Sequence, residues 1–209
     1  MTTVYLVRHS KPFRELEGET KTNDSLQLIN EKYPLGIEGE KLAERVAGGA
    51  EFGNIDVVWA SNYVRAISTA KYFAGRNNTK VNIDDRFGER LQGIIVWDEL
   101  PKDFHEKQFF DENYKFRDGE SRKEVALRMR EALFEVIKKN KGKRIVIVSH
   151  NAAITFLLMS LCEITRKNAE NVFVFKNKVV YSGNLNFCET FKLEFDDKPA
   201  LQSMTHIDT

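Results

Sequence analysis

Three short apolar runs constrain the possible folds of this chain more than any other feature. Polar side chains follow each run directly. The runs are residues 3–7 (TVYLV), 55–60 (IDVVWA) and 144–148 (RIVIV). Runs rich in β-branched residues, without polar alternation, are typical of strands that are buried on both faces of a parallel sheet. A shorter run at 81–83 predicts a fourth strand.

Helical patterns separate these strands. They cover residues 39–46, 63–73 and 121–139, and Ser121 is the expected N-cap of the longest. Strands that alternate with helices predict an α/β fold in which helices cover both faces of the sheet. Towards the C-terminus, residues 172–195 predict further strands around a turn at 181–184.

Residues 92–118 do not continue this alternation. The stretch is rich in Phe, Asp, Lys and Glu and has Pro101 near its start, so we expect a small helical or irregular cap insertion. No internal repeat or Gly/Ser-rich linker divides the chain. At 209 residues, we therefore predict a single domain over 1–209 with a cap at 92–118.

Charge and cysteine usage narrow the class of partner. The formal net charge is +1, so no long-range field is expected to attract nucleic acid or an anionic membrane. Cys162 and Cys188 are far apart in sequence and are expected to be reduced thiols. The N-terminus does not resemble a signal peptide, and the apolar stretch at 152–161 is too short to span a bilayer. We expect a cytoplasmic protein.

The residues after the predicted strands suggest an anion site. Ligands of open α/β sheets bind beyond the carboxyl ends of the strands, so residues that follow different strands are expected to meet there. The candidates are Arg8, His9 and Ser10 after the first strand, Ser61, Asn62 and Arg65 after the second, and Ser149, His150 and Asn151 after the 144–148 strand.

These residue types fit phosphoryl chemistry. Two guanidinium groups can hold the oxygens of a phosphoryl group, and helix N-termini at Asn62 and Asn151 would add backbone N–H groups. A neutral imidazole can attack phosphorus, and a second one can hydrogen-bond the charged oxygens in the transition state. An alkoxide leaving group also needs a nearby carboxylic acid as proton donor. A metal site on His9 and His150 is disfavoured, because adjacent guanidinium groups repel a cation.

The same segments resemble the motifs of a known family. LVRHS at 6–10 resembles the LVRHG signature of the histidine phosphatase superfamily, also called phosphoglycerate mutase-like. YPLGIEGE at 33–40 resembles its PLTxxGxxQ segment, and SNYVRAISTA at 61–70 resembles its SPLxRAxQTA. FGER at 87–90 stands where the family has LREx, GES at 119–121 resembles the start of its long helix, and VSHN at 148–151 resembles VSHG.

The resemblance implies a role for each matched residue. His9 would be the phosphorylated nucleophile and Glu89 the proton donor, while Arg8, Arg65 and His150 would form the phosphate pocket. It also implies a three-layer α/β/α sandwich with a mainly parallel central sheet, and no metal or other cofactor.

Two residues of the expected pocket depart from the family. Ser10 and Asn151 replace the glycines that usually follow the two histidines, and we expect both to contact phosphate. An Asn expected shortly after Lys11 is absent, and Arg14 or Glu15 occupies that region. Substrate specificity is therefore expected to depend on the cap and on residues 11–30.

The predicted function is a phosphomonoester hydrolase that acts on a small phosphorylated substrate through a phosphohistidine. The alternatives are a phosphoglycerate mutase-type phosphotransferase and a non-catalytic regulatory protein that binds phosphorylated ligands. Asp85, Glu99 and Glu106 compete with Glu89 as the acid. Glu120 and Ser121 are expected to cap the long helix, and His105 and His206 to lie on the surface. The leaving group and the oligomeric state are left open.

Overall fold

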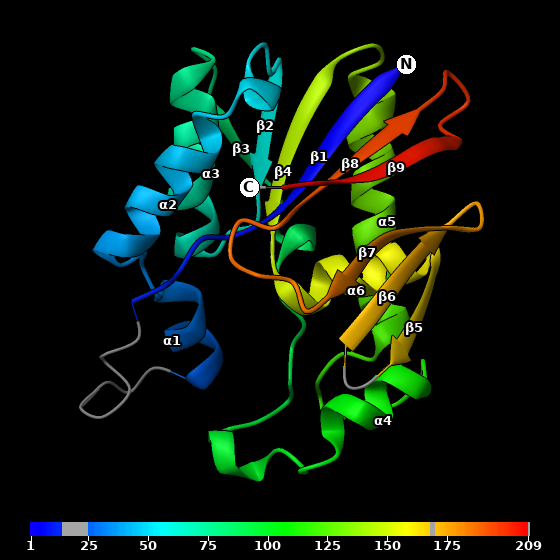
Figure 1. The fold of residues 1–209 in the computed structure, drawn as a ribbon. Helices are drawn as coiled ribbons and strands as arrows, with labels where there is room; N and C mark the ends of the chain where they lie inside the picture. The colour runs from blue at the N-terminus through cyan, green and yellow to red at the C-terminus, as the bar shows by residue number, and fades with distance from the viewer. Residues whose placement is uncertain (14–24, 168–169, 209) are drawn as a thin grey trace.

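A mainly parallel sheet forms the centre of the protein (Figure 1). The computed structural model describes residues 1–13, 25–167 and 170–208. The strands β1 (Thr2–Arg8), β2 (Val57–Ala60), β3 (Val81–Ile83) and β4 (Arg144–Ser149) are parallel, and β8 (Thr190–Phe195) and β9 (Leu201–Ile207) extend the sheet in antiparallel fashion. The order is β3-β2-β4-β1-β8-β9. All the strands predicted before residue 150 are confirmed.

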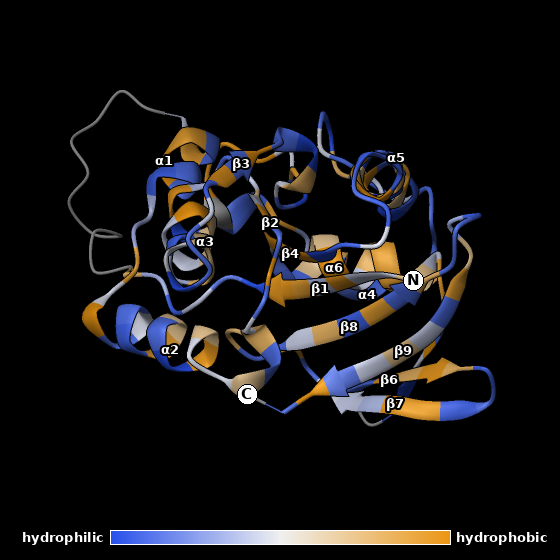
Figure 2. Cartoon of the chain, turned by 90° about the horizontal axis from the view of Figure 1, so that it is seen from above, coloured by the Kyte–Doolittle hydropathy of each residue, from blue (hydrophilic) through white to orange (hydrophobic). Residues whose placement is uncertain are grey.

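Helices cover both faces of this sheet (Figure 2). Alternate residues of β1 point to opposite sides, as the pleat of a strand requires. Tyr5 and Val7 pack with α2 (Ile37–Ala47) and α3 (Val64–Arg76), whereas Val4 and Leu6 pack with α5 (Arg122–Lys139) and α6 (Asn151–Met159). The fold is therefore the three-layer α/β/α sandwich that was predicted.

The helix starts follow local chemistry. Ser121 is the N-cap of α5, as expected, and the structure adds a reciprocal capping box with Glu124. Helix α3 begins at Val64 with Tyr63 as its N-cap, so the helix start expected at Asn62 lies two residues further on. The short helix α1 (Leu26–Lys32) was not predicted. Short 3-10 turns occur at η2 (Ala50–Phe52), η3 (Asp85–Phe87) and η4 (Trp97–Glu99).

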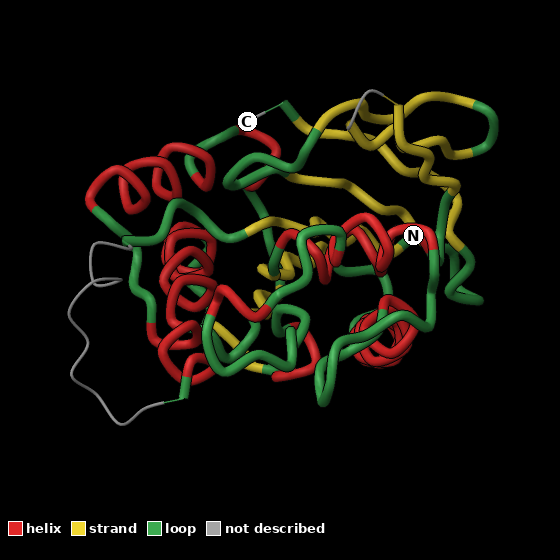
Figure 3. The backbone as a smooth tube through the Cα atoms, turned by 90° about the horizontal axis from the view of Figure 1, so that it is seen from below, coloured by secondary structure: helices red, strands yellow, loops and turns green. Residues whose placement is uncertain are grey.

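A second, antiparallel sheet contains β5 (Glu163–Lys167), β6 (Glu170–Phe175) and β7 (Lys178–Gly183), and β7 contacts β9 (Figure 3). The turn predicted at 181–184 is wrong, because residues 181–183 lie inside β7. The chain instead reverses at Lys176 and Asn177, which have φ of 49° and 62°. Two-residue turns with positive φ usually have the sequence Asn-Gly, but this one has Lys-Asn. The sequence therefore did not indicate a turn here. Strands β5 and β9 were not predicted.

Residues 92–118 leave and rejoin the fold at one narrow neck. The backbone N–H of Glu120 donates to the Leu91 carbonyl at 2.8 Å. A Cβ atom added to Gly119 would lie 2.7 Å from the carbonyl carbon of Gln92, so only glycine permits this approach. The segment contains η4 and α4 (Phe104–Phe110). Its interpretation as a cap insertion in a single domain remains a prediction.

Two sequence expectations concern the chain as a whole. Within the described ranges, no helix is long and apolar enough to cross a membrane. Cys162 is half-buried and Cys188 is buried.

Helix α2 packs closely against the segment after β1, and a substitution at Gly39 can measure how tight this packing is. A Cβ atom on Gly39 would lie 2.0 Å from the carbonyl oxygen of Lys11. We expect Gly39→Ala to lower the free energy of unfolding by about 2–3 kcal/mol, because backbone must shift to make room. Gly75→Ala is the matched control, since nothing lies within 4 Å of its added Cβ. That variant should gain about 0.5–1 kcal/mol in the same urea titration. Equal stability of both variants would contradict the tight packing.

Candidate active site

The parallel strands bring their C-terminal residues to one edge of the sheet. Arg8 stands beside Ser149 in register, and the backbone N–H of His9 donates to the Ser149 carbonyl at 2.9 Å. The N–H of Ser61 donates to the Val148 carbonyl at 3.1 Å. As a result, the imidazole rings of His9 and His150 lie with their centroids 5.0 Å apart. The meeting of these residues was predicted from the strand ends.

The hydrogen bonds of His9 define its tautomer. Nδ1 lies 2.7 Å from the carbonyl oxygen of Ser10, and a carbonyl only accepts, so Nδ1 carries the proton. In the neutral ring, Nε2 then has a free electron pair. Arg65 Nε donates to this atom at 3.1 Å. His9 is therefore held with a nucleophilic nitrogen facing a guanidinium group.

His150 is held as a neutral ring. Arg65 donates from a terminal nitrogen to His150 Nδ1 at 3.3 Å, so Nε2 carries the proton and donates to Ser61 Oγ at 2.7 Å. Burial and the charge of Arg65 hold the pKa of His150 well below its usual range. The side chain has no solvent exposure.

Two guanidinium groups border the histidines. Arg65 is buried, lies 4.7 Å from the Tyr63 ring centroid, and also donates to the Asn30 carbonyl of α1. Arg8 lies 4.3 Å from the ring centroid of Phe187 and donates to the Leu185 carbonyl. Both positive charges are fixed next to a histidine, an arrangement suited to an anion.

Phe187 was not predicted as part of the site. Its ring also lies 5.9 Å from that of His9. It arrives on the connection between β7 and β8, and the sequence has no signal that directs this connection to Arg8. Glu189 stabilises the same connection. Its carboxylate accepts hydrogen bonds from the backbone and side chain of Asn186 at 3.0 and 3.1 Å.

The carboxylate of Glu89 lies at the N-terminus of α6, the helix that begins directly after His150. Its carboxylate accepts from the backbone N–H groups of Ala153 at 3.0 Å, Ala152 at 3.3 Å and Arg90 at 2.9 Å. Its rival Glu99 instead forms an ion pair with Arg117 within the 92–118 segment. Glu89 thus contacts the backbone next to a pocket histidine, whereas Glu99 does not.

Ser10 and Asn151, both expected to contact phosphate, differ in their surroundings. Ser10 is fully buried, and its Oγ donates to the Gly39 carbonyl at 2.7 Å. Its backbone N–H donates to Thr69 Oγ1 at 2.9 Å. Asn151 is exposed at the first turn of α6. The hydroxyl of Ser10 therefore joins β1 to α2, a use that a glycine could not serve.

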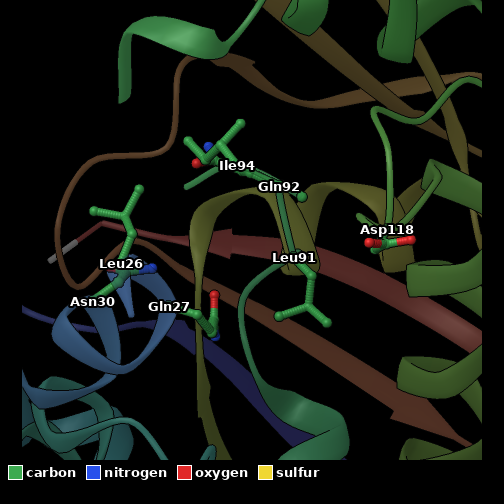
Figure 4. Close-up of a pocket in the computed structure, with 8 residues that line it drawn as sticks. Leu26, Gln27, Asn30, Leu91, Gln92, Ile94 and Asp118 are labelled. Carbon is green, nitrogen blue, oxygen red and sulfur yellow. The ribbon is translucent and has the colours of Figure 1, made fainter. Parts of the chain in front are cut away.

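Three cavities provide space for a ligand, and Glu89 lines one of them. One of about 280 Å³ is lined by Glu89, Asn62 and Tyr63 among others. A smaller one, of about 180 Å³, lies between α1 and the start of the 92–118 segment, and its lining residues include Leu26, Asn30 and Leu91 (Figure 4). On the side of Arg8, Phe13, Ile37 and Phe187 border a larger cleft of about 890 Å³. The positions of Arg14 and Glu15, expected to affect specificity, lie outside the described residues.

Several other expectations need correction. Glu120 does not cap α5; its carboxylate binds Arg128. His206 is not a simple surface residue, because it lies 2.5 Å from Glu189 and its ring is 4.6 Å from that of Tyr181. His105 is exposed, as predicted.

Comparison with known proteins identifies the family of the chain. The model of the histidine phosphatase superfamily (branch 1) matches residues 4–185. The chain belongs to the histidine phosphatase superfamily. One relative is the Probable phosphoglycerate mutase GpmB of Yersinia enterocolitica, which is 28% identical. The alignment covers 97% of this chain and 89% of the relative.

Solved structures of histidine phosphatase superfamily folds resemble the chain along nearly its whole length. Phosphoserine phosphatase from Entamoeba histolytica, in complex with 3-phosphoglyceric acid, superposes with a TM-score of 0.68 at 21% identity and covers 100% of this chain and 98% of its own. A mycobacterial glucosyl-3-phosphoglycerate phosphatase with inorganic phosphate gives a TM-score of 0.71 at 17% identity, with coverage of 99% and 95%. At these identities the likeness establishes a shared fold.

Proposed function

We propose that this member of the histidine phosphatase superfamily is a phosphomonoester hydrolase that forms a phosphohistidine on His9. The observation that carries the proposal is the tautomer of His9. Its Nδ1 proton is held by the Ser10 carbonyl, so the electron pair of Nε2 faces the Arg65 guanidinium. An incoming phosphoryl group would take over the Arg65 N–H groups and place phosphorus against Nε2.

The pocket supports transfer of the phosphoryl group. As the Nε2–P bond forms, the bond from phosphorus to the leaving oxygen breaks, and Arg8 and Arg65 neutralise the phosphoryl oxygens. A bound dianion favours the protonated form of His150, whose Nδ1 then donates to a phosphoryl oxygen. Before the phosphoryl group arrives, the same nitrogen accepts from Arg65.

Glu89 would serve both half-reactions. In the first it protonates the leaving oxygen; in the second its carboxylate takes a proton from water, whose oxygen attacks phosphorus as the P–N bond breaks. Its place at the N-terminus of α6, and beside the cavity of about 280 Å³, supports this role.

Two other functions remain as alternatives. The name of the Yersinia relative suggests a phosphoglycerate mutase, in which His9 would return the phosphoryl group to another hydroxyl. The named phosphatases of the same fold favour hydrolysis. A regulatory protein that only binds phosphorylated ligands would not need a nucleophilic nitrogen on His9 held against the Arg65 guanidinium.

We expect the purified protein to hydrolyse p-nitrophenyl phosphate and to leave 3-phosphoglycerate unisomerised. Released p-nitrophenol is followed by absorbance, and the phosphoglycerates by ³¹P NMR. Isomerisation faster than phosphate release would support the mutase instead. Absence of both reactions, together with binding of inorganic phosphate, would support the regulatory function.

The substrate is expected to be a small phosphorylated molecule, since the site is a local cluster of cations in a chain of net charge +1. Neither nucleic acid nor a membrane is an expected partner. The two cysteines, Cys162 and Cys188, are far apart in the sequence, which supports a cytoplasmic location.

A further inference from the structure

The turn that carries Glu89 follows the 3-10 turn η3 and is held by several side chains. Four successive backbone carbonyls, from Arg86 to Glu89, accept hydrogen bonds from side chains. Ser149 Oγ donates to the Phe87 carbonyl at 2.7 Å, and this serine precedes His150 in the pocket. The other three carbonyls all accept from one residue, Arg128 of α5.

Arg128 uses both of its terminal nitrogens on this turn. One donates to the carbonyls of Arg86 and Gly88 at 2.7 and 3.0 Å, and the other donates to the Glu89 carbonyl at 3.2 Å. A planar guanidinium can reach several acceptors at once, which a lysine ammonium cannot do in the same geometry. The backbone of Glu89 is thereby tied to a helix that begins more than thirty residues later in the chain.

Glu120 fixes Arg128 in turn. Its two carboxylate oxygens accept from Nε and a terminal nitrogen of Arg128 at 2.6 and 2.8 Å, a bidentate pair that is largely shielded from solvent. One of these oxygens also accepts from the backbone N–H of Leu91 at 2.9 Å, two residues beyond Glu89. The pair therefore holds the chain on both sides of Glu89, at the neck of the 92–118 segment.

We propose that the Arg128–Glu120 pair positions Glu89 as the proton donor. This inference rests on the proposed function. The backbone of Glu89 is fixed by Arg128 and its carboxylate by the N–H groups of Ala152 and Ala153, so the acid has a defined direction. Removal of the pair leaves the His9 pocket in place but releases one of the two anchors of the acid.

The test separates positioning of the acid from general loss of structure. A p-nitrophenolate leaves without protonation, whereas the more basic phenolate needs a proton donor, and the two phosphate esters have similar size. We compare kcat/KM for p-nitrophenyl phosphate and phenyl phosphate, which reports the steps up to formation of the phosphohistidine. In Arg128→Lys we expect about a 10-fold larger loss for phenyl phosphate than for p-nitrophenyl phosphate.

Three further variants make the result decisive. Arg130→Lys lies on the exposed side of the same helix and should leave both rates unchanged. Glu120→Gln keeps the shape of the side chain, and it should show the same selective loss as Arg128→Lys. Glu89→Gln sets the scale, with about a 100-fold selective loss expected.

Each outcome has one meaning. A selective loss in Glu89→Gln together with equal losses for both esters in Arg128→Lys and Glu120→Gln would overturn the positioning role while leaving the proposed function intact. If Glu89→Gln itself shows no selective loss, the proposed role of Glu89 is wrong. Circular dichroism checks that each variant is folded, and if Arg128→Lys does not fold, Glu120→Gln decides alone.

Discussion

His9→Ala is expected to reduce kcat/KM for p-nitrophenyl phosphate on the order of 10⁴- to 10⁶-fold, the range seen when a catalytic nucleophile is removed. The reason is that Nε2 of His9 is the nitrogen that the hydrogen bonds of the site leave unprotonated. Rapid quench of the wild-type protein and ³²P-labelled substrate in alkaline detergent should also trap phosphate on the enzyme, and this phosphate should be released by acid. The variant should trap none.

A histidine outside the pocket provides the control for this experiment. His105 is exposed on α4, and His105→Ala should keep wild-type activity and phosphate trapping. Full phosphatase activity in His9→Ala would exclude a phosphohistidine at this position. Trapping of phosphate by the wild type without turnover would instead indicate that water does not reach the intermediate, as a mutase requires.

Arg65→Lys is expected to have the second largest effect, a loss of about 10²- to 10³-fold in kcat/KM. Arg65 donates to both histidines, at 3.1 Å to His9 and 3.3 Å to His150. A single ammonium group cannot span both ring nitrogens and then hold two phosphoryl oxygens. Initial rates with p-nitrophenyl phosphate, over a range of concentrations, measure the loss.

The matched control lies on the same helix. Arg76, at the end of α3, donates to the Ala47 and Gly49 carbonyls far from the pocket in sequence, so Arg76→Lys should retain activity. A loss of less than about 3-fold in Arg65→Lys would show that the charge alone is sufficient. In that case the two hydrogen bonds from Arg65 to the histidines would not contribute to catalysis.

The edge of the sheet where the site forms was predictable from sequence. Each buried run is a strand, and parallel strands present their carboxyl ends at one edge. Residues 8–9, 61 and 149–150 therefore had to meet once the parallel topology was recognised. The capping box of Ser121 and Glu124 was equally accessible, because both partners lie within one helical turn.

Expectations failed where local sequence does not decide the structure. The turn at Lys176 and Asn177 lacks a glycine, while the Tyr181–Gly183 stretch resembles a turn but pairs with β6. The bond from the Ser10 hydroxyl to the Gly39 carbonyl was also not predicted. It depends on the close approach of α2 to the chain, which leaves Gly39 no room for a side chain.

The sequence by itself determined the four parallel strands and the long helices between them, the edge at which the pocket lies, and the residue types that make it suitable for an anion. Only the tertiary structure decided that Phe187 stacks on Arg8, and that Arg128 and Glu120 hold the turn of Glu89. The physical reason is that helical periodicity predicts which side chains of α5 lie near its buried face, but not what those side chains contact. Which loop such a side chain reaches depends on how the layers pack, and that contact joins residues about forty positions apart.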